Sequence, residues 1–343
     1  MRIAELVEIG RIAFRETERP VTGPGEMVVK VGAVGLCGTD LKAYLRGHPY
    51  FTPPCVLGHE FAGTVAEVGP GVDAFHPGEA VVAAPYVECG TCDLCRKGLG
   101  ELCRRKAFIE GALQEYVRLP ADIVRRGTFL LPDGVGPKTG TLAEPLACAV
   151  NGVEKAGIAP GETVLVVGGG PMGALLAMIA RSITPHVLIS EIAPARLDAL
   201  RSLGLSTVDA SAESVTDRLH DAFGAPLADK VLIAVGVRDV AEEAMAWTAP
   251  GGTALLFGGL PKDERLTIDP FAVHYQEVSI VGSFGFRLDH FRAAVAWLAE
   301  HADQAEHLIT DTVPFEQVED GFHLARSADG LKTVVRLGEH DAG

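Results

Sequence analysis

The sequence lacks a long apolar run and is short of positive charge. None of its stretches approaches the roughly 18 consecutive apolar residues that a membrane-spanning helix needs. Near its start, Glu5, Glu8 and Arg11 interrupt the apolar segment that a secretory signal would require. Its 30 Lys and Arg residues against 45 Asp and Glu give a formal net charge of −15, which argues against binding to a phosphate backbone. We therefore expect a cytoplasmic protein with no membrane and no nucleic-acid partner.

The sequence also lacks an even number of cysteines. Seven cysteines without a secretory signal argue against stable disulfides. Four of them, Cys89, Cys92, Cys95 and Cys103, form the pattern C-x2-C-x2-C-x7-C. Such spacing lets one loop surround a tetrahedral zinc with four thiolates, which leaves no open coordination position and predicts a structural site.

Three alternatives for these cysteines fit less well. An iron–sulfur cluster is disfavoured by the long x7 gap and by the absence of a Cys-Pro pair. A redox C-x-x-C would lie beside a βαβ unit, which this loop does not. A zinc ribbon that reads nucleic acid conflicts with the net charge of −15.

The length of 343 residues predicts two domains, and we find no internal repeat. The first part is rich in Gly and Pro, with short strand-like runs at 26–36, 61–69 and 79–87. From 163 onward strands and helices alternate, which predicts a doubly wound parallel sheet. The expected strands are 163–168, 186–190, 229–236, 252–259 and 278–285, and the expected helices are 171–183, 193–204 and 238–249. A helix at 288–304 and short strands at 310–315 and 332–337 follow, and this end of the chain is expected to pack on the first domain.

A glycine motif lies between the first of these strands and its helix. Gly168, Gly170 and Gly173 form G-x-G-x-x-G, with Pro171 and Met172 between the last two. Alone the pattern is weak, but strand, glycines and helix in this order predict a dinucleotide site. The helix N-terminus offers free N–H groups to a pyrophosphate.

Two charged residues bear on the choice of nucleotide. Glu191 ends the next strand, where a carboxylate accepts hydrogen bonds from both adenosine ribose hydroxyls and repels a 2′-phosphate. This favours NAD over NADP. Arg196 follows closely and keeps NADP open, because an arginine there can receive the phosphate.

A second set of metal-ligating residues is scattered through the chain. Cys37, His59, Glu60 and Glu144 supply a thiolate, an imidazole and carboxylates. A mixed set of this kind suits zinc with one position left for water or substrate. By itself, however, one Cys and one His at this separation are common by chance.

Five segments together carry a resemblance. These are "GLCGTDLKAY", "VLGHEFAGTVAEVGPGV", "CGTCDLCRKGLGELC", "LAEPLACAV" and "VGGGPMG". In this order, and over nearly the whole chain, they resemble the zinc-dependent medium-chain dehydrogenase/reductase family, most closely its polyol and threonine dehydrogenase branches.

The resemblance implies a fold of class α/β plus β. A GroES-like catalytic domain with both zinc sites would span 1–147 and 288–343, and a Rossmann NAD-binding domain would span 148–287. Ser283 and Phe284 match the family strand near the nicotinamide. The resemblance also implies a homodimer or homotetramer.

The resemblance further implies roles at the catalytic site. Cys37 and His59 match zinc ligands, and Glu60 and Glu144 match carboxylates that bind the zinc directly, through water, or by turns. Thr39 matches the hydroxyl that relays the substrate proton, and Asp40 matches a second partner of the zinc site.

The implied reaction is oxidation of a secondary alcohol of a polyol, sugar, cyclitol or amino-alcohol, with hydride transfer to NAD. Zinc would lower the pKa of the alcohol as a Lewis acid. The alternatives are an NADP-dependent reductase of aldehydes or ketones and a non-catalytic nucleotide-binding member, although the complete ligand set argues against the latter. Gly285 stands where sorbitol-type enzymes carry an Arg, and Arg287 is a candidate to replace it.

Overall fold

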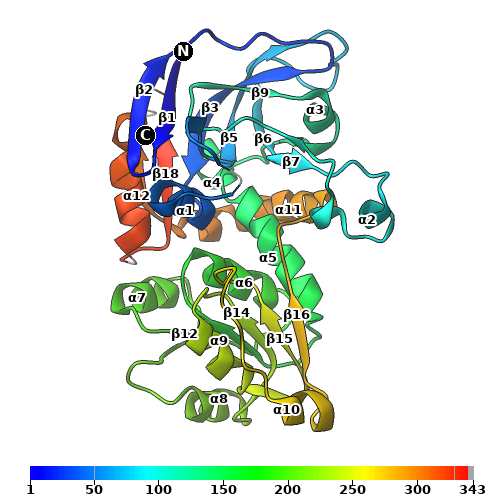
Figure 1. The fold of residues 1–343 in the computed structure, drawn as a ribbon, viewed down its shortest axis with the longest axis vertical. Helices are drawn as coiled ribbons and strands as arrows, with labels where there is room; N and C mark the ends of the chain where they lie inside the picture. Colours follow the sequence, from blue (N-terminus) through cyan, green and yellow to red (C-terminus); the bar gives the residue numbers. More distant parts are fainter. Residues whose placement is uncertain (50, 328, 339–343) are drawn as a thin grey trace. The chain divides into compact units, whose positions relative to one another are not determined.

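The chain forms two compact units. The computed structural model describes residues 1–49, 51–327 and 329–338 (Figure 1). The first unit is Met1–Ala147 together with Phe286–Gly343, and the second is Cys148–Gly285. Residues 339–343 of the expected first domain lie outside the described residues.

The chain returns to the first unit two residues before the boundary expected at 288. Phe286 stacks on Tyr86, with 4.5 Å between ring centroids. Arg287 lies beside Glu101, with 4.0 Å between Nη1 and Oε2. Because these contacts are made within the first unit, Phe286 and Arg287 belong to it.

The first unit is built on antiparallel strands. Its main sheet has the order β10-β6-β5-β3-β18-β17, with β9 also paired to β3, and β18 and β17 are parallel. Figure 1 shows the red C-terminal segments beside the blue N-terminal ones within this unit, as the pairing of β18 with β3 requires. The strands are β1 (Arg2–Glu8), β2 (Arg11–Glu16), β3 (Met27–Gly35), β4 (Cys55–Val56), β5 (Glu60–Val68), β6 (Ala80–Ala83), β7 (Tyr86–Val87), β8 (Ala107–Phe108), β9 (Tyr116–Leu119), β10 (Thr128–Leu130), β17 (Ile309–Pro314) and β18 (Lys332–Arg336).

Helices of very different length accompany this sheet. Helix α5 (Ala143–Ala156) contains the boundary between the units. The other helices of the first unit are α1 (Gly38–Arg46), α2 (Asp93–Arg96), α3 (Ala121–Gly127), α4 (Pro137–Gly140), α11 (Leu288–Glu306) and α12 (Val318–Ser327), with 3-10 turns at Gly100–Leu102 and Phe315–Gln317.

The second unit contains a six-stranded parallel sheet in the order β13-β12-β11-β14-β15-β16. Every residue of β11 and β12 is buried, as expected for strands covered on both faces. The strands are β11 (Val164–Val167), β12 (Val187–Glu191), β13 (Thr207–Asp209), β14 (Ala228–Ile233), β15 (Thr248–Leu256) and β16 (Ser279–Gly282). The helices are α6 (Pro171–Arg181), α7 (Pro194–Ser202), α8 (Val215–Phe223), α9 (Arg238–Met245) and α10 (Pro270–Tyr275).

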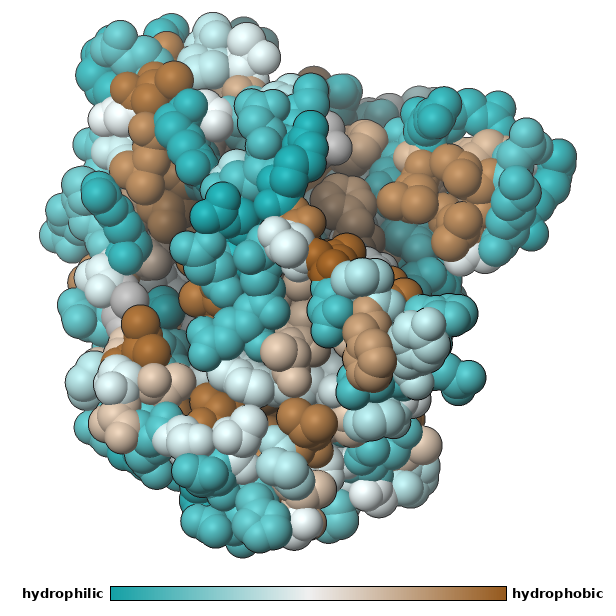
Figure 2. Space-filling model, turned by 60° about the horizontal axis from the view of Figure 1, so that its bottom comes forward, coloured by the Kyte–Doolittle hydropathy of each residue, from teal (hydrophilic) through white to brown (hydrophobic). Residues whose placement is uncertain are grey.

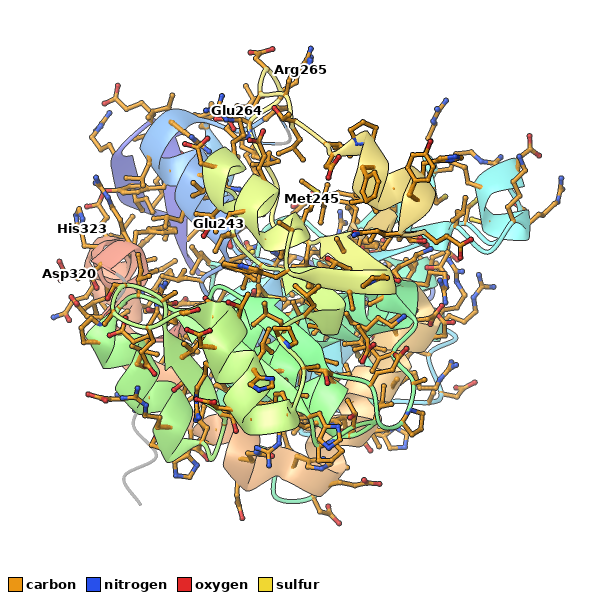
Figure 3. All side chains as sticks on the ribbon, turned by 90° about the horizontal axis from the view of Figure 1, so that it is seen from below. Glu243, Met245, Glu264, Arg265, Asp320 and His323 are labelled. Atoms are coloured by element: carbon orange, nitrogen blue, oxygen red, sulfur yellow. The ribbon has the colours of Figure 1, made fainter. Side chains whose placement is uncertain are left out.

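On the face shown in Figure 2, hydrophobic side chains occur in small groups between hydrophilic ones. Glu243 on α9, Glu264 after β15 and Asp320 on α12 are exposed acids of this kind, labelled in Figure 3. In the described part of the chain, none of the helices combines the length and apolar character needed to span a membrane.

Candidate functional site

Three of the predicted ligands come together in the first unit. Donor atoms of Cys37, His59 and Glu60 all lie within 4.8 Å of one another. Cys37 caps the N-terminus of α1, where its sulfur accepts the Thr39 N–H at 3.4 Å. His59 immediately precedes β5, and Glu60 is its first residue. The cluster therefore joins the end of β3 to the start of β5.

Asp40 orients His59. It is fully buried, and its carboxylate lies 3.3 Å from His59 Nδ1 and accepts the N–H groups of Gly58 and Cys37. Burial alone would raise the pKa of Asp40, but the attraction to His59 and these hydrogen bonds lower it. Because Nδ1 faces Asp40, Nε2 is the nitrogen left for a metal.

The charges of the cluster fit a cation such as zinc. Burial alone would lower the pKa of His59, but Asp40 and Cys37 raise it well above its ordinary value. Surroundings that favour a proton on this ring also favour a divalent cation. A sulfur, an imidazole nitrogen and a carboxylate oxygen form a donor set that zinc accepts with one position open.

A buried lysine, which the sequence analysis missed, completes these surroundings. Lys332 of β18 forms an ion pair with Glu60 of β5, and their side chains are 4% and 1% exposed. Its ammonium also donates to the Leu36 carbonyl at 3.1 Å. Burial alone would lower the pKa of Lys332, but Glu60, Cys37 and Glu144 raise it. The lysine is therefore a fixed positive charge beside the cluster.

Gly35 makes room for this ion pair. It lies on β3, between Glu60 on one neighbouring strand and β18, where it pairs with Val334, on the other. A Cβ on Gly35 would overlap the Glu60 carboxylate and lie 3.1 Å from Lys332 Cε. A lysine at the start of the apolar run "KTVVRL" was the only signal in the sequence.

Glu144 and Thr39 occupy different places. Glu144 lies in the first turn of α5 and is not part of the compact donor group found among the described residues. Its charge nevertheless acts on Lys332. Thr39 lies in the first turn of α1, two residues after Cys37, and is partly exposed.

The four sulfurs of Cys89, Cys92, Cys95 and Cys103 also converge in the first unit. Distances from Cys95 Sγ to Cys89 Sγ and Cys92 Sγ are 3.9 and 3.4 Å, and Cys92 Sγ lies 3.8 Å from Cys103 Sγ. A tetrahedral zinc with bonds of about 2.3 Å separates its sulfurs by about 3.8 Å. These spacings fit a zinc bound by four thiolates.

The thiols of this loop differ strongly in acidity. The pKa of Cys89 is lowered to about 5, first by the hydrogen bond from the Thr91 N–H, whereas burial raises the pKa of Cys95 to about 12. The N–H groups of Cys89 and Arg105 donate to Cys103 Sγ at 3.4 and 3.3 Å. Such N–H···S bonds hold the sulfurs in place.

Arg287 serves this loop and is not free to bind a substrate. Its Nη1 lies 4.0 Å from the buried Glu101 Oε2 and donates to the Gly98 carbonyl at 3.4 Å. Its Nη2 pairs with Asp289 at 3.1 Å. The suggestion that Arg287 replaces a substrate-binding arginine at Gly285 is therefore wrong, because the four-cysteine loop already occupies its guanidinium.

The glycine motif has the expected geometry in the second unit. Gly168 follows β11 with φ of +96°, a conformation that favours glycine. A Cβ on Gly173 would overlap the Gly168 carbonyl. Gly170 caps α6, and Pro171 and Met172 form its first turn. The N-terminus of α6 is therefore open to an anionic group.

Glu191 and Arg196 flank this turn. Glu191 ends β12, and its buried carboxylate accepts the N–H groups of Gly169, Ile192 and Ala193 at 2.8, 2.6 and 2.9 Å. The Arg196 guanidinium lies over Gly170, 3.5 Å from the place of a Cβ there. A carboxylate and a guanidinium thus lie on either side of the motif.

Ser283 and Phe284 follow the edge strand β16, in the same unit as the motif. The Ser283 N–H bonds to the Leu256 carbonyl at 3.2 Å, and Phe284 is 57% exposed. The Ser283 hydroxyl accepts a hydrogen bond at 3.1 Å from Nδ2 of Asn151, a residue that the sequence analysis missed.

Comparisons with known proteins agree with this geometry. Residues 23–132 match the family model of the alcohol dehydrogenase GroES-like domain, and residues 171–300 match that of the zinc-binding dehydrogenases. The chain is 33% identical over 331 residues to L-galactonate-5-dehydrogenase of Escherichia coli K12, covering 94% of this chain and 95% of that relative. The chain belongs to the zinc-dependent medium-chain dehydrogenase/reductase family.

Other members of this family are equally similar. D-altritol 5-dehydrogenase of Agrobacterium fabrum is 35% identical over 327 residues, 93% of this chain and 94% of that one. A zinc-binding dehydrogenase of Sinorhizobium meliloti, solved with NADP bound, has a TM-score of 0.89 and 31% identity and covers 98% of this chain and 99% of its own. The predicted GroES-like domain with a Rossmann sheet is thereby confirmed.

Proposed function

We propose that this dehydrogenase oxidises a secondary alcohol of a polyol or sugar derivative to the ketone, with NAD as the hydride acceptor. The observation that carries the proposal is the convergence of Cys37, His59 and Glu60, with Asp40 behind His59. The names of the relatives refer to L-galactonate and D-altritol, which are an open-chain sugar acid and an open-chain polyol, and they support such a substrate over a cyclitol or amino-alcohol.

Each residue of the site has a distinct role in the proposed reaction. Cys37 and His59 would hold a zinc ion, with Glu60 within reach, and Asp40 keeps the His59 ring in place. Such an ion acts as a Lewis acid that lowers the pKa of a substrate hydroxyl. Thr39 Oγ1, two residues from Cys37, is the group that accepts and passes on the alcohol proton. Lys332 keeps the Glu60 carboxylate in position.

The test is nucleotide reduction, followed by absorbance, against linear polyols, sugar acids, cyclitols, amino sugars, threonine and simple secondary alcohols. We expect turnover with linear polyols or sugar acids, and we expect a zinc chelator to abolish it by removing the Lewis acid. Readdition of zinc is the control for recovery. Zinc-loaded protein that binds nucleotide and turns over none of these alcohols would contradict the proposal.

The preference for NAD is supported by Glu191. A 2′-phosphate beside this buried carboxylate would meet like charge, and unpaired like charges at close range are unfavourable. Arg196 over Gly170 and the NADP-bound relative favour the alternative, an NADP-dependent reductase. We expect wild type to bind NAD at least tenfold more tightly than NADP, a difference of about 1.4 kcal/mol.

The Glu191→Gln variant removes the negative charge, so the NAD preference should shrink toward parity. Its one amide oxygen can accept the Ile192 and Ala193 N–H groups, whereas the Gly169 N–H, which bonds to the other carboxylate oxygen, loses its acceptor. Dissociation constants of NADH and NADPH measured by fluorescence provide the comparison. Tighter NADPH binding by wild type would show that Arg196, and not Glu191, decides the cofactor.

We also infer two zinc ions per chain and a homodimer or homotetramer. The two donor clusters support the metal content. Assembly is supported by the open edge of β16 and by exposed Phe271 and Tyr275 on the neighbouring α10, which are 56% and 73% exposed. Sedimentation of the wild type as a monomer would contradict the assembly.

A further inference from the structure

Asn151 is the one asparagine in the sequence, and it holds the segment that follows β16. It lies on α5 and is completely buried. Its Nδ2 donates to Ser283 Oγ at 3.1 Å, to the Phe284 carbonyl at 3.4 Å and to the Gly285 carbonyl at 2.9 Å. One side-chain amide thus fixes three consecutive residues.

The other end of the same amide is left unsatisfied. Asn151 Oδ1 is buried and has no hydrogen-bond partner among the described residues. A buried unpaired acceptor costs free energy, which a leucine of similar shape would avoid. Asparagine at this position therefore contributes through its two N–H donors, which hold the segment after β16. A hold with this cost suggests that the conformation of the segment matters for function.

The hold on the carbonyls determines where one N–H group points. In a planar trans peptide the C=O and the following N–H point in opposite directions. Because the Phe284 carbonyl faces Asn151, the Gly285 N–H points away from Asn151. Within the described chain, neither this N–H nor that of Phe284 has a hydrogen-bond partner. The segment therefore presents free donors at the carboxyl end of β16.

The order of the strands indicates which part of a bound dinucleotide would lie near these donors. A doubly wound sheet binds a dinucleotide across the carboxyl ends of its strands, at the point where the strand order reverses. Here that point is β11, which lies between β12 and β14. Glu191 on β12 marks the side where the adenosine would bind, so the nicotinamide half would lie over the side of β14, β15 and β16.

We propose that Asn151 is a positioning residue for the nicotinamide half of the cofactor. By binding the Phe284 and Gly285 carbonyls it turns the Gly285 N–H toward the ligand, where it donates to the carboxamide oxygen of the nicotinamide. The inference rests on the proposed function, because it requires a nicotinamide nucleotide on this sheet.

The test compares NADH with ADP-ribose, which has the adenosine and both phosphates but no nicotinamide. In Asn151→Leu, the affinity for NADH should fall about tenfold, because the carboxamide loses an oriented donor. The affinity for ADP-ribose should change less than twofold. Titration calorimetry measures both on the full-length protein.

Thr184→Val is the matched control. Thr184 is buried in the same unit and donates to the Glu162 carbonyl at 2.8 Å, before the amino end of β12. It should lose a similar hydrogen bond without altering either affinity. An equal loss of NADH and ADP-ribose affinity in Asn151→Leu, or no loss of either, would overturn the inference. If wild type bound neither ligand, the proposed function would be wrong, and the inference with it.

A measurement on the wild type avoids any folding defect of the variant. Selective ¹⁵N-labelling of asparagine side chains gives a single Nδ2H₂ signal pair, since Asn151 is the only asparagine. We expect NADH to shift this pair and ADP-ribose to leave it nearly unchanged, because only NADH engages the held segment. Equal shifts with both ligands would contradict the proposal.

Discussion

Replacement of Lys332 by methionine is expected to lower the free energy of unfolding of the first unit by about 3–5 kcal/mol in metal-free protein. The substitution leaves the Glu60 carboxylate, 1% exposed, without its positive partner. Removal of one member of a buried ion pair is costly because the other charge remains in a medium of low polarity. Urea unfolding in the presence of a chelator measures the loss.

Zinc should reduce this cost. The Glu60 oxygen lies within reach of the Cys37 and His59 donors, so a bound cation supplies part of the missing positive charge. We therefore expect the variant to lose less stability when zinc is present than when it is chelated. A loss that is independent of zinc would mean that Glu60 takes no part in the metal's surroundings.

The double variant Lys332→Met with Glu60→Gln is the control for charge. It removes both charges while nearly preserving volume, and such replacements of buried pairs are often tolerated. It should recover most of the stability lost by the single variant. If the single and double variants were equally unstable, the loss would reflect packing against Gly35 and Leu36, and the electrostatic explanation would be wrong.

The features of the site that are local in the sequence could be predicted from the residues. The four cysteines lie in one loop, and the three glycines lie in one turn between a strand and a helix. In both cases spacing along the chain determines geometry, because few backbone angles separate the groups. Cys37 and His59 lie on separate elements, and only the resemblance to the family predicted that they share one site.

Lys332 and Asn151 could not be found in this way. Lys332 meets Glu60 only because β18 pairs with β3 and β3 pairs with β5. Asn151 meets Ser283 and the two carbonyls after it through packing of α5 on a distant segment. Contacts between strands or helices that are remote in sequence leave no periodic signal. Arg287 was misassigned for the same reason, since its partner Glu101 lies in the four-cysteine loop.

The secondary structure was also predicted only in part. The long apolar runs correctly indicated most of the alternating elements of the second unit, but β13, α8 and α10 were not predicted. Strand β13 has only three residues, too few for a pattern. The apolar run expected as a strand over 229–236 continues beyond the end of β14 at Ile233, because the change from strand to loop there is not marked by a change in residue type.

Replacement of Cys92 by serine is expected to lower the zinc content from two ions per chain to one. Cys92 Sγ lies 3.4 Å from Cys95 Sγ and 3.8 Å from Cys103 Sγ, so its loss opens the tetrahedron. A hydroxyl is a poor substitute for a thiolate, and structural zinc contributes its binding free energy to folding. Plasma mass spectrometry of the purified protein measures the metal content.

Loss of this zinc should destabilise the four-cysteine loop and, through Arg287, the start of α11 within the first unit. Arg287 connects the loop, through Glu101 and the Gly98 carbonyl, to the start of α11. Amide hydrogen exchange should therefore rise at 89–106 and at the first turn of α11, while the Cys37 and His59 cluster keeps its zinc.

Cys55→Ser is the matched control, because Cys55 is partly buried and belongs to neither donor group. It should keep two zinc ions and wild-type exchange. If Cys92→Ser also kept two, the four-cysteine loop would hold its shape by packing alone, and the agreement of its sulfur spacings with a zinc tetrahedron would be a coincidence.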